Sequence, residues 1–490
     1  DAVVERWWAE KTDWVPMVSC ATSRGLATPL TRYGRAIALC LLGSVLASWF
    51  SSALAGSLKV DDLQISLFQK ISCGALVGLG LAGAAVLFLK AWLAAPRQPL
   101  GGLLPLALVM HAVCFAALPC TSNDIFSNLA YGRELLAGLN PFHDLPVDLG
   151  ADPILPYVGS VWTHWSTCYG PLTTMIAAVA AWPAGIVVPM LLFKLVMLAC
   201  SLATVLLAYD VCRACLLPKH AAQAFILLAW NPLLAWEVSG QAHNDGLLVL
   251  ALAVFVWAAV RHWQWLAAAA LIAGFYLKFA ALPLIGLYGL YVGRQRLARS
   301  LLMGVALVAV GVVLFAPFWR GTATLEPALL ASTASHDYLA NSLTMFVVGA
   351  GRLIDPQAAP ALFRIVMLAT RIVCLVLAVF FAFRARSVTR VIQDGLVFLL
   401  VFECLGMGWF QPWYATWLLP LAVACRSARL QWIVAVYTAT IPVLYLPGFG
   451  LIVLGIAVHM FPLVMLVRLW QTRPAGKPTS VGTSALAGVS

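Results

Sequence analysis

A lone carboxylate, Asp124, stands where an apolar stretch ending near Pro119 gives way to a polar segment that continues through Tyr131 and Arg133. An ionised side chain is costly in hydrocarbon, so an acid at the end of a membrane-spanning helix is by default a functional-site hypothesis. There it could remove a proton from a water-soluble group while facing a lipid-borne one. Its neighbours Asn123, Tyr131 and Arg133 are candidate substrate-binding residues. Capping of a following helix by Asn123 or Asp124 is the structural alternative, and the two roles can coexist.

A second group of polar residues follows the dipeptide Asn231-Pro232, which would end an apolar helix near the outer face of a membrane. The next loop offers an acid, an imidazole, an amide and a second acid within nine residues: Glu237, His243, Asn244 and Asp245. Asn244 or Asp245 could simply cap the next helix. Four groups of complementary type exceed what one cap needs, and we expect them to orient substrate hydroxyls.

Three cations are candidates for holding a phosphate. Lys278 lies between apolar residues, where it could either extend to the membrane surface or bind an anion at headgroup depth. Arg320 and Arg352 lie in a later polar segment, and guanidinium groups pair well with phosphate oxygens. An ordinary role in loop structure is the alternative for both arginines.

An aromatic run at residues 409–420 contains Gln411, Trp413 and Tyr414. Aromatic residues gather at membrane interfaces whatever the function, so a structural belt is one interpretation. The other is a sugar platform, because aromatic faces stack on the C–H surfaces of a pyranose and an amide can bind its hydroxyls.

The elements that must position these residues are membrane helices. The chain has 490 residues, of which 62% are hydrophobic and only 10% are charged, which excludes a soluble domain. Backbone groups in lipid must bond internally, and the apolar runs lack strict alternation, so we predict an all-α polytopic membrane protein. We expect a bundle of about 12–14 transmembrane helices. Within it, 264–292 should form a hairpin of short or tilted helices, while 171–184 is ambiguous.

Charge predicts the orientation of the bundle. With a cytoplasmic N-terminus, about 21 of the 30 Lys and Arg residues fall on the cytoplasmic side. We therefore expect both termini inside a bacterial plasma membrane and the candidate site outside. The predicted parts are a cytoplasmic or interfacial segment (1–35), one integral-membrane domain (36–470) with two long extracytoplasmic loops (120–185 and 319–360), and a disordered cytoplasmic tail (471–490).

The order of these pieces resembles the GT-C superfamily of integral-membrane glycosyltransferases. The nearest resemblance is to polyprenyl-phosphate-mannose-dependent α-mannosyltransferases, the group with DUF2029/GT87-like and MptA/MptB-like members. The matching stretches run from Asn123-Asp124 through Tyr169-Gly170-Pro171, Asn231-Pro232 and Lys278 to Trp413-Tyr414. Three spans precede the first long loop, where the family core usually has one, and we interpret two of them as an N-terminal addition.

In that superfamily an acid in the first large extracytoplasmic loop acts as the base, and the resemblance places this role on Asp124. It implies an inverting enzyme that moves mannose or another sugar from a polyprenyl-phosphate carrier to a hydroxyl of a glycan or glycolipid. No cofactor is required, although Asp124 with Asp245 or Glu237 could bind a divalent metal, and nucleic acid is not expected as a partner. The alternative is a transporter or flippase for a lipid-linked or anionic solute.

Overall fold

The computed structural model describes residues 29–55, 67–96, 99–216, 218–327, 341–445 and 450–471. Within these ranges the regular elements are helices, and no strand occurs. The α-helices are α2 (Pro29–Ala55), α3 (Leu67–Ala94), α4 (Leu103–Phe115), α5 (Asp124–Leu136), α6 (Pro171–Ala181), α7 (Val187–Cys215), α8 (Pro218–Ala229), α9 (Pro232–Leu234), α10 (Asp245–Val260), α11 (Gln264–Leu277), α12 (Leu282–Gln295), α13 (Leu297–Phe315), α15 (Leu343–Ile354), α16 (Ala359–Arg384), α17 (Val388–Val401), α18 (Leu418–Ala424), α19 (Ala428–Thr440) and α20 (Gly450–Gln471).

The helical elements confirm an all-α polytopic membrane protein. In the described part of the chain, seven helical segments are long and apolar enough to cross a membrane, and five further apolar helices have 10–17 residues. The segment 264–292 forms the predicted short hairpin, α11 and α12. The ambiguous segment 171–184 contains α6, whose 11 residues are too few for a full crossing.

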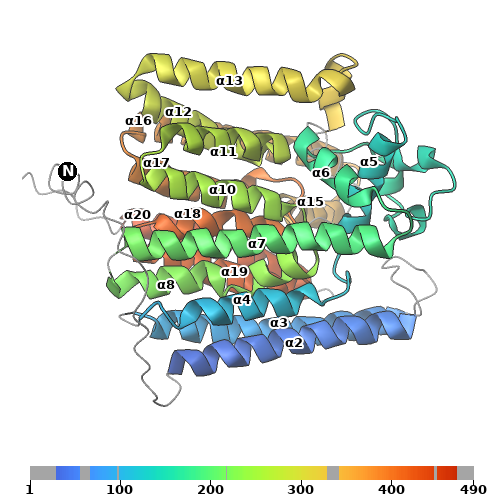
Figure 1. Cartoon of the computed structure of the whole chain (residues 1–490), viewed down its shortest axis with the longest axis horizontal. Coiled ribbons are helices and arrows are strands. Elements are labelled where there is room, and N and C mark those ends of the chain that lie inside the picture. Colours follow the sequence, from blue (N-terminus) through green and yellow to red (C-terminus); the bar gives the residue numbers. More distant parts are fainter. Residues whose placement is uncertain are drawn as a thin grey trace, which may run out of the picture.

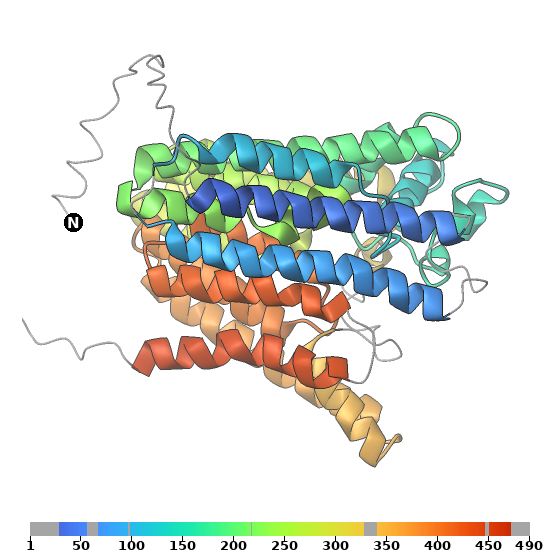
Figure 2. The ribbon, with the colours of Figure 1, turned by 90° about the horizontal axis from the view of Figure 1, so that it is seen from below.

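The long helices lie side by side along one direction (Figure 1). Helices α2 and α3 form one flank of the bundle and α13 forms the opposite flank, while α5 and α6 gather at one end (Figure 1). The view from below shows α2 and α3 reaching the same end of the bundle (Figure 2). Helices α8, α10 and α18 fill the interior, where Leu227, Phe255 and Leu418 are fully buried.

Packing of α10 against α11 brings two of the predicted site residues together. The first helix begins at Asp245, a short turn follows Val260, and the second runs back to Leu277. Because the helices have 16 and 14 residues, the start of one lies beside the end of the other. Asp245 and Lys278 consequently lie at the same end of the hairpin.

Both long loops contain helices. The 120–185 loop includes α5, α6 and the 3₁₀ turns η1 (Pro146–Leu149), η2 (Leu155–Tyr157) and η3 (Trp162–His164). The 319–360 loop includes α15, while its residues 328–340 lie outside the described ranges. Residues 1–28 of the predicted N-terminal segment and 472–490 of the predicted tail also lie outside them, and α2 already begins at Pro29.

Candidate active site

Asp124 is the first residue of α5, and Asn123 occupies the N-cap position without its side chain capping the helix. The Ser122 hydroxyl donates to Asp124 Oδ1 at 2.9 Å and accepts from the Asp124 N–H at 3.1 Å. This turn fixes the carboxylate at the amino end of a helix, where the helix dipole favours negative charge. Asn123 therefore has the N-cap position without capping the helix by its side chain, and Ser122 holds the Asp124 carboxylate in a defined orientation.

His243 lies between two carboxylates. Its Nδ1 is 3.6 Å from Asp124 Oδ2, and its Nε2 is 3.2 Å from Glu237 Oε2. The π-helical turn η4 (Ala235–Gly240) and a positive φ of 59° at Ala242 bring the chain back, so that the His243 N–H donates to the Glu237 carbonyl at 3.0 Å. The indole of Trp413 stacks on the imidazole, with ring centroids 3.6 Å apart and planes 15° apart.

The two carboxylates favour the protonated imidazole. Burial alone would lower the pKa of His243, but the bonds and charges of Asp124 and Glu237 outweigh it and raise this pKa from 6.5 to about 9. Burial also opposes ionisation of Asp124, yet contacts with His243 and Ser122, together with the charge of Lys278, leave the pKa of Asp124 below its usual 3.8. Asp124 is therefore ionised near neutral pH and free to accept a proton, beside a cationic His243.

Glu237 is fully buried, and the hydroxyl of Tyr445 donates a short hydrogen bond to its Oε1. Tyr445 closes the 3₁₀ turn η11 (Ile441–Tyr445) after α19. The chain of contacts Tyr445–Glu237–His243–Asp124 thus runs from η11 through the buried Glu237 to the first residue of α5. Sequence reasoning missed Tyr445, because it lies in an apolar stretch that carries no polar signal.

Lys278 and Asp245 form a second charged group next to the first. Lys278 Nζ lies 2.8 Å from both Asp245 carboxylate oxygens, and Trp417 Nε1 donates to Asp245 Oδ1 at 2.6 Å. The ammonium also lies over the rings of Tyr414 (4.6 Å), Trp417 (5.3 Å) and Tyr169 (5.5 Å). Aromatic faces stabilise such a cation, and Tyr414 and Trp417 of the aromatic run form a box around Lys278 together with Tyr169 of the first loop.

The remaining polar residues of the first loop join these groups by hydrogen bonds. Asn244 Nδ2 donates to Asn128 Oδ1 at 3.0 Å, and Asn128 Nδ2 donates to the Asp124 carbonyl at 2.8 Å. The Tyr131 hydroxyl donates to the Trp165 carbonyl at 3.1 Å, and its ring packs edge-on to Tyr169. Asn244 is thus linked through Asn128 to the first residue of α5, and Tyr131 contacts Tyr169, one of the rings near Lys278.

The three predicted arginines lie elsewhere. Arg133 pairs with Asp152 and donates to the Gly185 carbonyl, so it connects α5 to the surrounding loop. Arg320 is more than half exposed and lies 3.7 Å from Asp144. Arg352 is exposed in the last turn of α15. Within the described part of the chain, no hydrogen bond or ion pair joins Arg320 or Arg352 to Asp124 or Lys278.

Gln411 precedes the 3₁₀ turn η10 (Pro412–Trp417), and its carbonyl accepts from the Tyr414 N–H at 3.0 Å. The turn presents Trp413 to His243 and Tyr414 to Lys278. Gln411 is half-buried beside them. The predicted polar and aromatic groups of this run therefore lie around both charged groups.

Access separates the residues that could meet a substrate from those that support them. The side chains of Asp124 and Lys278 each retain 15% exposure, whereas those of His243, Glu237 and Asp245 retain 1% or less. An accessible anion and an accessible cation in one cluster can accept a proton and hold a phosphate, respectively.

Among the described residues, no three His, Cys, Asp or Glu side chains are grouped as ligands for a metal ion. Cys120 and Cys168 are not joined by a disulfide.

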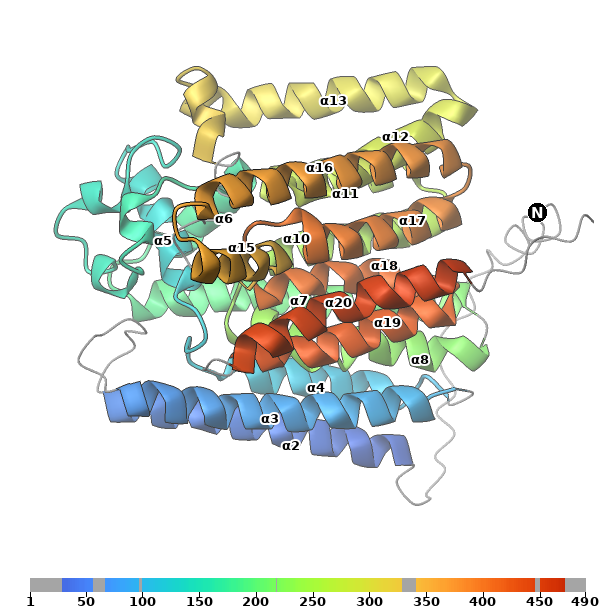
Figure 3. The same cartoon turned by 180° about the vertical axis from the view of Figure 1, so that it is seen from behind.

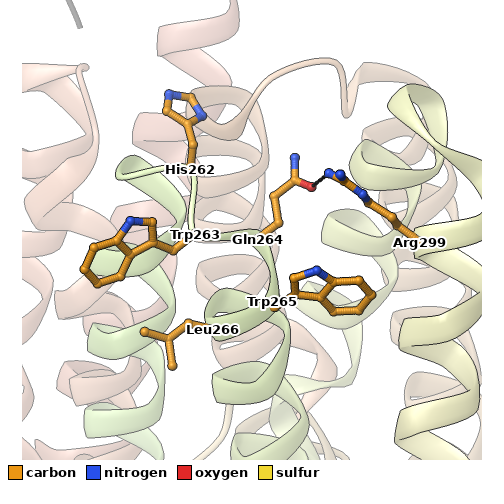
Figure 4. Close-up of a pocket in the computed structure, with 6 residues that line it drawn as sticks. All are labelled: His262, Trp263, Gln264, Trp265, Leu266 and Arg299. Carbon is orange, nitrogen blue, oxygen red and sulfur yellow. Dashed lines mark hydrogen bonds between the residues drawn. The ribbon is translucent and has the colours of Figure 1, made fainter. Parts of the chain in front are cut away.

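A separate pocket of about 400 Å³ lies at the other end of the α10–α11 hairpin and is unrelated to this cluster. Figure 4 shows Trp263 and Trp265 beside Gln264, whose Oε1 accepts from Arg299 at 2.8 Å. Asp245 begins α10, whose 16 residues span about 24 Å, and the pocket lies beyond the other end of this helix.

Residues 34–294 match the sequence model of the MptA_B family, described as alpha-(1->6)-mannopyranosyltransferase, N-terminal domain. This match covers more than half of the chain. The protein belongs to this mannosyltransferase family. The matched region contains Asp124, His243, Asp245 and Lys278, so the family assignment and the charged cluster fall on the same part of the chain. No curated protein matches the chain.

Proposed function

We propose that this mannosyltransferase takes its sugar, mannose or a related one, from a polyprenyl-phosphate carrier and transfers it with inversion to a hydroxyl of a glycan or glycolipid. The observation that carries the proposal is the pairing of a partly exposed carboxylate with a partly exposed ammonium in one cluster. Such a carrier unites an anionic phosphate with a long apolar chain, and the cluster lies at the end of an apolar helical bundle.

Asp124 is the base in this proposal. The acceptor hydroxyl attacks the anomeric carbon, its proton passes to Asp124, and the bond from that carbon to the phosphate oxygen breaks. The electron pair of that bond leaves with the phosphate, which is already a good leaving group and needs no separate acid. Because attack comes from the face opposite the phosphate, the anomeric centre inverts.

Lys278 stabilises the charge that the phosphate gains. Preorganised cations act most strongly where charge develops in a water-poor site. The ammonium is held in the aromatic box of Tyr169, Tyr414 and Trp417, and the pair with Asp245 keeps it in place until an anion arrives. The half-buried Gln411 provides an amide for the sugar, whereas the buried Trp413 stacks on His243 and holds the imidazole in place.

His243 and Glu237 hold Asp124 in position and influence its protonation. The imidazolium keeps Asp124 ionised, and Glu237 keeps the imidazole protonated. Because both are buried, we assign them no contact with the substrate.

The distribution of basic residues supports an active site on the outer face. Arg294, Arg384 and Arg468 lie in the last turns of α12, α16 and α20. In Figure 3 these helix ends lie on the side opposite α5 and α6. Arginine-rich ends face the cytoplasm, so the Asp124 cluster would face outward.

The test is transfer from a synthetic polyprenyl-phosphate mannose by the purified protein in a lipid bilayer. Asp124→Asn should lower the transfer rate by about 10²–10⁴-fold, the usual contribution of a general base, while donor binding is retained. Asp355→Asn is the matched control, because Asp355 is an exposed carboxylate following α15 and should have no effect. Full activity of Asp124→Asn would remove Asp124 as the base.

A further inference from the structure

A groove of about 530 Å³ lies between α3, α19 and α20, far from the Asp124 cluster. Its lining residues are Trp92, Ala428, Arg429, Trp432, Ile433, Met465, Arg468 and Leu469. They come from the last turns of α3 and α20 and the first turns of α19, which lie together in Figure 3. The segment from Ala428 to Tyr445, which ends at the cluster, spans about 25 Å if helical, so the groove opens at the other end of the bundle.

The rim of the groove is cationic. Arg429 and Arg468 are both exposed, and none of the lining residues is acidic. Arg468 lies in the last turn of α20, and the groove belongs to the arginine-rich end of the bundle. Such an end attracts the anionic headgroups of the cytoplasmic leaflet.

One residue that lines the groove, Trp92, carries a hydrogen-bond donor without a partner. Trp92 is 3% exposed, and its indole Nε1 has no hydrogen-bond partner. An indole N–H can only donate, and buried donors are normally paired. An acceptor atom that enters the groove would satisfy it.

The remaining wall is apolar and aromatic. Trp432, Ile433 and Met465 supply ring and aliphatic surface next to the two arginines. A free phosphate ion would use only the cationic rim. A phospholipid would use both parts, with its headgroup phosphate at the arginines and the start of an acyl chain along the wall.

We propose that this groove is a binding site for an anionic phospholipid, with Arg468 and Arg429 on the headgroup and the Trp92 N–H donating to a headgroup or ester oxygen. The pocket at Trp263 and Trp265 is a weaker candidate, because none of its lining residues carries a buried side-chain donor without a hydrogen-bond partner.

The experiment uses the full chain in detergent, with phosphatidylglycerol, phosphatidylcholine or inorganic phosphate added separately. Bound lipid is counted by native mass spectrometry, and the melting temperature is followed in parallel. Phosphatidylglycerol should bind and raise the melting temperature, whereas phosphatidylcholine should bind more weakly and phosphate should have no effect. Arg468→Gln should weaken phosphatidylglycerol binding by about fivefold, the effect expected for one basic residue at a lipid surface.

Trp92→Phe removes the N–H and keeps most of the buried ring surface, so it tests the donor if Arg468→Gln folds poorly. It should also weaken phosphatidylglycerol binding. Arg386→Gln is the control, because Arg386 is exposed at the same end of the bundle and lines neither pocket. Equal binding of both lipids, unchanged binding in both groove variants, or a full shift with phosphate alone would each overturn the proposal.

Discussion

Lys278 Nζ lies 2.8 Å from each carboxylate oxygen of Asp245, so the cation proposed for the donor phosphate is already paired with an acid in the absence of substrate. The Asp245 side chain is 1% exposed and that of Lys278 is 15% exposed. Removing one partner of such a buried pair leaves the other charge uncompensated, which is more destabilising than removing both.

This relationship predicts a strongly non-additive pair of substitutions. Lys278→Met and Asp245→Asn should each cost about 3–5 kcal/mol of stability, and the double variant should recover part of that loss. Thermal unfolding of the four proteins in detergent measures the coupling.

Activity separates the structural role of Lys278 from its proposed role toward phosphate. The double variant should remain a poor enzyme with a raised KM for the donor, because its cation is absent even though its fold is restored. Additive losses of stability would contradict the buried pair, and a normal KM in the double variant would contradict phosphate binding by Lys278.

The flanking of His243 by Asp124 and Glu237 predicts the pH dependence of transfer. Ionised Asp124 is needed as the base, and its pKa lies below 3.8, so activity should persist down to about pH 4. His243 loses its proton as the pH rises through about 9, so activity should fall there. The same ion pairs stabilise the fold fully below pH 6.5, and this stabilisation is lost as the pH rises through about 9.

Replacing His243 by Gln should change both limbs of a kcat/KM profile. The fall near pH 9 should disappear, because no imidazolium remains to titrate. The acid limb should move to higher pH, because burial of Asp124 is no longer opposed by a neighbouring cation. A profile identical to that of the original protein would show that His243 does not tune Asp124.

The sequence indicates which residues cluster in the fold. It is less informative about which residue each of them contacts. Asp124, His243 and Lys278 were identified from isolated polar groups in an apolar chain, because such groups are too costly to be incidental. Whether Lys278 extends to the surface, holds an anion or pairs with an acid depends on the register of α10 against α11. That register is set by side-chain packing, which the hydropathy pattern does not encode.

Two kinds of residue were beyond sequence reasoning. Tyr445 reads as part of an apolar span, and only the approach of η11 to η4 brings its hydroxyl to Glu237. Arg320 and Arg352 have the residue type expected of a phosphate clamp, but Arg320 faces Asp144 and Arg352 is exposed in the last turn of α15. Residue chemistry indicates what a side chain can bind, whereas long-range packing decides what it meets.

Tyr445→Phe should show that the hydrogen bond from Tyr445 to Glu237 supports the action of Asp124 as the base. Loss of a hydrogen bond to a buried carboxylate costs about 1.5–3 kcal/mol, and kcat should fall with little change in the KM for the donor. Tyr209→Phe is the control, because the Tyr209 ring packs on Phe225 away from the cluster. If kcat of Tyr445→Phe is unchanged, the Glu237–His243 contact does not need this hydroxyl.

Gly170→Ala should damage the site through the backbone. Gly170 precedes α6, and its N–H donates to the Leu277 carbonyl at 3.1 Å. A methyl group added there would lie 2.0 Å from the Tyr276 carbonyl oxygen, so α6 and the end of α11 would have to separate. Tyr169, which precedes Gly170, and Lys278, which follows Leu277, would then move apart. We expect a lower melting temperature and a raised KM for the donor. Gly286→Ala in α12 is the control, because its added methyl group meets nothing within 4 Å and should raise helix stability slightly. A Gly170→Ala protein with unchanged KM would show that the aromatic box around Lys278 does not depend on this close approach.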